Sequence, residues 1–91
     1  MYKYELIVIF DSDDKNFEEV KSTTAEILTL NSSNIIEEKN IGQRNLAFPI
    51  KEKNKGHYFL FVVEIDPNNF KEIEKAFKLN KAILRHLFIR V

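Results

Sequence analysis

Residues 42–65 read GQRNLAFPIKEKNKGHYFLFVVEI and predict two β-strands joined by a polar turn. The first part places Leu46, Phe48 and Ile50 at alternate positions, which is the period of a half-buried strand. The run KEKNKG at 51–56 has the composition of a hairpin turn. This stretch therefore predicts a β-hairpin with a basic tip.

The two strands of this hairpin differ in character. Pro49 cannot donate a hydrogen bond to a neighbouring strand, which predicts that the first strand lies at a sheet edge. Residues 57–65 are rich in aromatic and β-branched side chains and are apolar at nearly every position. The second strand is therefore expected in the middle of the sheet.

The rest of the chain supplies two helices and two further strands. Residues 2–10 alternate as a strand, and acidic and polar residues at 11–14 offer caps for a helix that ends near Leu30. Asp66-Pro67-Asn68-Asn69 begins a second helix, and residues 82–91 form the last strand. The apolar stripes of the helices are Phe17, Val20, Thr24, Ile27 and Leu28 in the first, and Phe70, Ile73, Ala76 and Phe77 in the second.

This order of elements is strand, helix, strand, strand, helix, strand. Two right-handed βαβ-type connections then give an α+β fold of the ferredoxin-like split βαβ type (βαββαβ). We expect one domain over residues 1–91, with a four-stranded antiparallel sheet and both helices on one face. The second, third, first and fourth strands should follow one another across the sheet.

The uncovered face of such a sheet should meet water or a partner. Alternation from Glu64, and from Lys3 and Glu5, predicts which side chains of the two central strands lie on this open face. In the last strand we expect Leu87, Ile89 and Val91 to pack inward and His86, Phe88 and Arg90 to point outward. The predicted open face then forms an apolar patch that suggests a protein partner, although long Lys and Glu side chains covering a smaller patch would also fit. Its residues are Ile7, Ile9, Tyr58, Leu60, Val62, His86 and Phe88.

Charge is unevenly distributed along this neutral chain. Residues 1–38 carry a net charge of −6 and residues 39–91 a net charge of +6, so one part can meet a polyanion. The candidate phosphate contacts are Lys3, Arg44, Lys51, Lys53, Lys55, Lys81, Arg85 and Arg90. Solvated lysines on an exposed loop are the more common explanation for the loop cluster taken alone, and Arg44 and Arg85 also fit a role in bracing the sheet through carboxylates. The RNP1 pattern is absent, so bases are not expected to stack on the sheet.

The sequence offers little catalytic chemistry. There is no cysteine, His57 and His86 have no metal-ligand spacing, and the only glycines are Gly42 and Gly56. No stretch is long and apolar enough to span a bilayer, and no signal or transit pattern is present. We therefore expect no enzyme, no cofactor, no metal, no small-molecule substrate and no membrane contact.

Two stretches resemble a known family. Residues 42–51, GQRNLAFPIK, are similar to the signature of the bacterial-type small-subunit ribosomal protein number six, in which a glycine and a basic residue precede Leu-Ala-Tyr-Pro-Ile. Residues 82–89, AILRHLFI, resemble the closing Val-Leu-Arg-x-Leu strand of that family. Phe48 stands where the family usually has Tyr, and without the family's polar C-terminal tail the chain resembles a short bacterial or organellar form.

This resemblance implies a non-catalytic protein of the small ribosomal subunit. It implies binding to the central domain of the small-subunit rRNA together with the eighteenth small-subunit protein, as a heterodimer. Such a heterodimer would supply more cationic surface than this neutral chain alone. The location would be the ribosome of a bacterium or, as second choice, of a mitochondrion or plastid. The alternative function is a stand-alone ferredoxin-like module that homodimerises through its open sheet face and binds a small effector.

Overall fold

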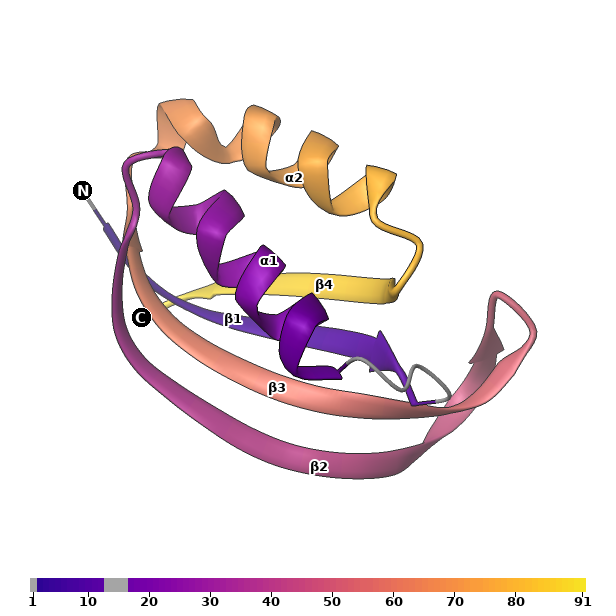
Figure 1. Ribbon diagram of the computed structural model, residues 1–91. Coiled ribbons are helices and arrows are strands. Elements are labelled where there is room, and N and C mark those ends of the chain that lie inside the picture. The colour runs from indigo at the N-terminus through magenta and orange to yellow at the C-terminus, as the bar shows by residue number, and fades with distance from the viewer. Residues whose placement is uncertain (1, 13–16) are drawn as a thin grey trace.

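The computed structural model describes residues 2–12 and 17–91 and has the predicted split βαβ architecture. Two helices lie side by side over one face of a four-stranded sheet (Figure 1). The strands follow the order β2-β3-β1-β4, and every neighbouring pair is antiparallel. The elements are β1 (Tyr2–Asp11), α1 (Phe17–Leu30), β2 (Asn34–Ile50), β3 (Lys53–Ile65), α2 (Phe70–Leu79) and β4 (Ile83–Arg90).

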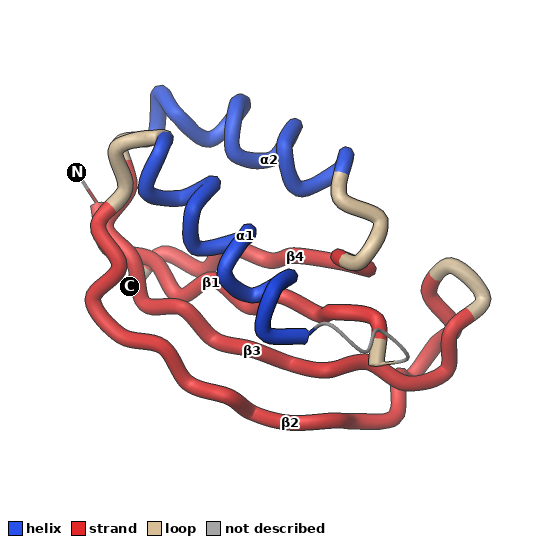
Figure 2. Tube along the Cα trace, viewed as in Figure 1, coloured by secondary structure: helices blue, strands red, loops and turns tan. Residues whose placement is uncertain are grey.

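The core lies between the sheet and the two helices, as the alternation predicted. The two central strands send every second side chain into it: Tyr4, Leu6, Val8 and Phe10 from β1, and Phe59, Phe61, Val63 and Ile65 from β3. Leu28 of α1 and Ile73 and Phe77 of α2 are buried against these strands. Both described helices lie on this side, so they leave the opposite sheet face, with the alternate side chains, open (Figure 2).

The helix ends follow local chemistry. Asp66 accepts a hydrogen bond from the backbone N–H of Asn68 at 3.0 Å, and Pro67 opens the one-turn 3₁₀ helix Pro67–Asn69 that leads into α2. At the end of α1, the N–H of Ser33 donates to the Leu28 carbonyl, and Ser32 has a φ of 61°, which is a Schellman ending. The predicted first-turn acids Asp13 and Asp14 lie outside the described residues.

The β2–β3 hairpin is longer and tighter than predicted. Only Lys51 and Glu52 form the turn, both at positive φ, and the prediction that the whole run 51–56 is a loop is wrong because β3 begins at Lys53. The hairpin extends past the end of β1 and curves upward there (Figure 1). The Lys51 Nζ donates to the Ile83 carbonyl at 3.2 Å, and the Lys53 Nζ lies 3.5 Å from the Asp11 carboxylate.

Phe48 departs from the predicted half-buried strand, because 79% of it is exposed. The last pair between β1 and β3 is Asp11 with Gly56, so within the described residues no third strand covers the hairpin beyond Gly56. The register between β2 and β3 also shifts between Asn45 and Ile50. These two features leave the outer hairpin exposed, and the alternation of side chains in the sequence could not reveal either of them.

The predicted orientation of β4 is wrong. His86 pairs with Val8 and Phe88 with Leu6, so both residues lie on the helix-covered face. The register shift between Ile9 and Phe10 lets both Ile83 and Leu84 become buried, which breaks simple alternation along β4. Leu87, Ile89 and Val91, predicted to be inward, are 50%, 42% and 61% exposed.

Aromatic packing explains why His86 and Phe88 lie on the helix-covered face of the sheet. The Phe88 ring lies 4.9 Å from Phe70 and 6.3 Å from Tyr4, centroid to centroid, and so fills the space beneath α2. The His86 ring packs edge-on against Phe77 at 5.2 Å, and its Nε2 lies 3.7 Å from the Glu74 carboxylate. The larger aromatic rings therefore occupy the core side of β4.

Burial lowers the pKa of both histidines. Desolvation lowers the pKa of His86 below its ordinary value of 6.5, with nearby Lys78 acting in the same direction and Glu74 opposing them. Desolvation also lowers the pKa of His57, whose ring stacks on Phe17 at 3.9 Å and whose Nε2 lies 2.6 Å from the Asn40 Oδ1. Both imidazoles are therefore mainly uncharged at neutral pH.

The lowered histidine pKa values predict a loss of stability in mild acid. Below pH 6.5 the unfolded chain binds more protons at these positions than the folded chain, so the free energy of unfolding falls as the pH drops through and below that value. Denaturant unfolding between about pH 7.5 and 5.5 measures this dependence. The double variant His57→Gln, His86→Gln should show a flatter dependence, and equal slopes in the two proteins would contradict the assignment.

Gly56 should not tolerate a side chain. A Cβ there would clash with the Cγ2 of Ile9, a branched side chain that is itself 9% exposed and cannot easily move away. We expect Gly56→Ala to lower the free energy of unfolding by about 1–3 kcal/mol through this clash. Gly42→Ala is an informative comparison, because its Cβ would meet no atom within 4 Å and its cost comes only from a φ of 100°. Ile9→Ala removes the Cγ2, so Gly56→Ala should cost less in the Ile9→Ala background than in the wild type, which would verify the contact. An unchanged stability for Gly56→Ala alone would refute it.

Candidate protein and nucleic-acid interfaces

The open face of the sheet is a set of cross-strand rows. Leu60, Ile7 and Leu87 form the central row across β3, β1 and β4. The neighbouring rows join Tyr58, Ile9 and Arg85 on one side, and Val62, Glu5 and Ile89 on the other. We call these nine residues the open face.

The open face is apolar at its centre and bordered by charge. Leu87 and Ile89 are half exposed, while Ile9 lies almost fully beneath its neighbours. A pocket of about 300 Å³ opens beside the central row and is lined mainly by apolar side chains. Its lining residues are Ile7, Ile9, Tyr58, Arg85, His86 and Leu87. A surface of this kind suits the apolar side chains of a protein partner.

The predicted partner residues divide between the two faces of the sheet. The structure places Ile7, Ile9, Tyr58, Leu60 and Val62 on the open face, and it places the rings of His86 and Phe88 against α2. The sequence prediction did not include Leu87 and Ile89 among the open-face residues. Their pairing with Ile7 and Glu5 was hidden because residues 87–89 form a continuous apolar run, which fits either face equally well.

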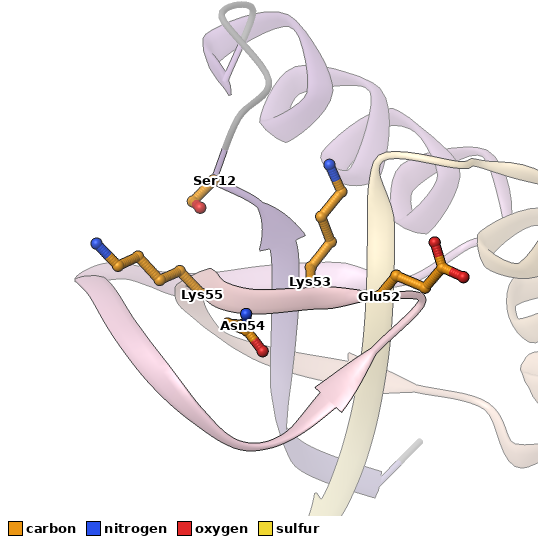
Figure 3. Close-up of a pocket in the computed structure, with 5 residues that line it drawn as sticks. All are labelled: Ser12, Glu52, Lys53, Asn54 and Lys55. Carbon is orange, nitrogen blue, oxygen red and sulfur yellow. The ribbon is translucent and has the colours of Figure 1, made fainter.

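Most of the predicted cations gather at the hairpin end of the molecule. Arg44 pairs with Gly56 on the outer hairpin, and it lines a polar pocket of about 360 Å³ together with Gln43, Asn45 and Lys55. A second pocket, of about 350 Å³, is lined by Ser12 and by residues 52–55 (Figure 3). Lys53 and Lys55 both extend from β3 around this pocket, with Asn54 directed differently between them. We call Arg44, Lys51, Lys53 and Lys55 the hairpin cations.

The neighbouring start of β4 adds further positive charge. Lys81 is exposed and lies in the turn before β4. The carbonyl of the next residue, Ala82, accepts a hydrogen bond from the Asp11 N–H. A pocket of about 380 Å³ lies between Lys51, Lys78 and Arg85, over Phe77 and His86. Because the lowered pKa of His86 leaves its ring uncharged, lysine and arginine alone supply the positive charge here. Lys78 was missed, and its place in the last turn of α2, three residues before Lys81, was the available signal.

Two predicted cations lie at the other end of the sheet. Lys3 pairs with Glu64 across β1 and β3, and the Arg90 guanidinium lies 3.7 Å from the centroid of the Tyr2 ring. The molecule extends 35 Å along its longest axis, and a strand advances about 3.3 Å per residue. Lys3 and Arg90 therefore do not belong to the cluster at the hairpin end. Within residues 2–12 and 17–91, neither Arg44 nor Arg85 forms an ion pair with a carboxylate.

Two other kinds of site are absent from the same described ranges. No group of three or more His, Asp or Glu side chains there is arranged to hold a metal ion. No helix in that part of the chain has the length and apolar character needed to cross a membrane.

Comparison with known proteins identifies the family. The family described as ribosomal protein S6 matches residues 3–90. Two relatives named small ribosomal subunit protein bS6 align over 91 residues: that of Treponema pallidum strain Nichols is 34% identical, and that of Treponema denticola 36%. In each case the alignment covers 100% of this chain and 98% of the relative. The Rickettsia canadensis protein of the same name is 34% identical, with 98% of this chain and 74% of the relative covered.

A solved structure supports the fold independently. The crystal structure of 30S ribosomal protein S6 from Thermotoga maritima superposes with a TM-score of 0.90 at 22% identity, covering 99% of this chain and 87% of that one. The resemblance noted from the two sequence stretches is thereby confirmed. The chain belongs to the ribosomal protein S6 family and is a structural, non-enzymatic constituent of the small ribosomal subunit.

Proposed function

We propose that this protein binds the central domain of the small-subunit rRNA as a heterodimer with the eighteenth small-subunit protein. In this proposal the open face docks the protein partner, and the hairpin cations with Lys78, Lys81 and Arg85 contact rRNA phosphates. All of its named relatives above are bacterial, which favours a bacterial ribosome over an organellar one. The observation that carries the proposal is the separation of an apolar sheet face from a basic hairpin end.

The composition of the open face supports a protein partner. Leu60, Ile7 and Leu87 run across three strands without an intervening charge. Desolvating such side chains contributes about 25 cal/mol per Å² of buried apolar surface. The flanking Glu5 can fix orientation at the rim, where charged residues are usual.

The hairpin end supports contact with a polyanion. Residues 42–56 hold four cations against the single acid Glu52, a net charge of +3 in a chain whose total charge is zero. Lysine and arginine contacts to phosphate are largely independent of sequence and fix position. Base-specific readout by the sheet face is not part of the proposal.

A charge at the centre of the open face should prevent heterodimer formation. Leu87 is half exposed in the free protein, so Leu87→Asp should fold normally but bury an unpaired carboxylate in the complex. We expect the affinity for the eighteenth protein to fall at least 30-fold, roughly 2 kcal/mol, in isothermal titration calorimetry. Leu30→Asp, at the 76% exposed end of α1, is the matched control.

Two other outcomes of that experiment would overturn the assignment. Equal affinity of Leu87→Asp and wild type would place the partner surface elsewhere. Homodimerisation of the wild type through this face, without binding of the eighteenth protein, would favour the effector-binding module over the ribosomal heterodimer.

Loss of the hairpin cations should change the salt dependence of rRNA binding. The double variant Arg44→Gln, Lys55→Gln should reduce the slope of log affinity against log salt concentration by about one per lost phosphate contact. Filter binding of the heterodimer to a central-domain rRNA fragment measures the slope. Lys71→Gln, Lys75→Gln removes two exposed cations of α2 as the control. An unchanged slope in the hairpin variant would show that the RNA lies elsewhere, with Lys3 and Arg90 the next cations to test.

A further inference from the structure

The most exposed aromatic residue on the hairpin is unexplained by the fold or by phosphate contacts. Phe48 is 79% exposed, whereas most other phenylalanines of the chain are buried in or packed against the core. Within the described residues, no other aromatic ring or cation stacks on the Phe48 ring. Leaving a phenylalanine in water forgoes the stabilisation that burial of its ring usually contributes.

The surroundings of Phe48 are basic. Arg44 and Lys51 flank it along the chain, and the register places residues 46–49 between the pairs Asn45–Lys55 and Ile50–Lys53. A free aromatic ring among cations is the arrangement that holds unpaired nucleotides, where the ring stacks on a base and the cations meet the adjoining phosphates. A purely apolar partner surface would instead have to desolvate these cations without neutralising them.

The backbone next to Phe48 is restrained. Pro49 restricts Phe48 to extended backbone, and the hairpin tip is held by the hydrogen bond from Lys51 to Ile83 and the ion pair of Lys53 with Asp11. These restraints reduce the backbone freedom that this segment can lose on binding, which favours affinity.

We propose that Phe48 is an RNA-binding residue that stacks on an unpaired base of the bound rRNA. This proposal rests on the proposed rRNA binding. It adds one contact to a base, made by the hairpin and not by the open face, beside the phosphate contacts of the hairpin cations. It makes Phe48 sensitive to the presence of a single-stranded nucleotide, such as a bulge or loop, rather than to a regular duplex.

Direct binding measurements test the stacking contact. The heterodimer carrying Phe48→Ala should bind a central-domain rRNA fragment roughly 5- to 150-fold more weakly, the effect of about 1–3 kcal/mol per stacked base. Phe48→Leu keeps an apolar side chain without a ring face and should lose a similar factor, while Phe48→Tyr should bind like wild type. The slope against salt should stay unchanged in all three variants, because no phosphate contact is lost. Leu30→Ala, at a similarly exposed apolar residue at the end of α1, is the control.

Fluorescence gives a second readout of the same contact. The chain contains no tryptophan, so Phe48→Trp introduces a single reporter, provided that a tryptophan-free or constant-background partner is used. Stacking on a base should quench its emission on addition of the rRNA fragment, and a fully paired RNA duplex should leave it nearly unchanged.

The possible failures are distinguishable. If Phe48→Ala binds rRNA within twofold of wild type while Arg44→Gln, Lys55→Gln is weakened, rRNA binding stands and the stacking proposal is refuted. If Phe48→Ala weakens binding of the eighteenth protein but not of rRNA, Phe48 is a protein contact and the proposal is again refuted. If the wild-type heterodimer does not bind the fragment, the proposed function fails, and the stacking contact fails with it.

Discussion

One-sided burial of the sheet is the constraint on which this structure depends. Side chains of the two central strands alternate between the two faces, and those directed at α1 and α2 form most of the sheet side of the core. The two helices lie on the same face (Figure 1), so the alternate residues of the same strands are left without cover. The apolar open face is therefore not a defect of the core. It follows from the same alternation, which places Ile7, Leu60 and Leu87 on the face that α1 and α2 do not cover.

The hairpin extension gives the molecule a second surface that is physically separate from the first. Beyond the pair of Asp11 with Gly56, β2 and β3 continue as a two-stranded ribbon, and no other strand of residues 2–12 and 17–91 pairs with it. A ribbon of this kind is marginal by itself, and side-chain contacts from Lys51 to Ile83 and from Lys53 to Asp11 fix it to the ends of β4 and β1. Cations thus serve two purposes here, since they hold the hairpin and also give it a positive charge.

The sequence predicted the fold well, because the strongest patterns in it are also the ones the core uses. The order of elements, the edge position of β2 and the inward residues of β1 and β3 all followed from alternation, caps and Pro49. The orientation of β4 could not be predicted, because the run Leu87-Phe88-Ile89 is apolar on both faces and a register shift precedes it. The candidate RNA-binding site could be predicted only in part. Residue type indicated the cations, but their clustering depends on how far the hairpin extends past β1.

The most direct test of the central claim, that the two surfaces bind different partners, is hydroxyl-radical footprinting of the side chains during stepwise assembly. Addition of the eighteenth protein alone should protect Leu60 and Leu87 and leave Phe48 reactive. Subsequent addition of the central-domain rRNA should protect Phe48 without further change at Leu87. Protection of Phe48 by the protein alone, or of Leu87 only by the RNA, would contradict the division of the molecule into an apolar sheet face for protein and a basic hairpin for RNA.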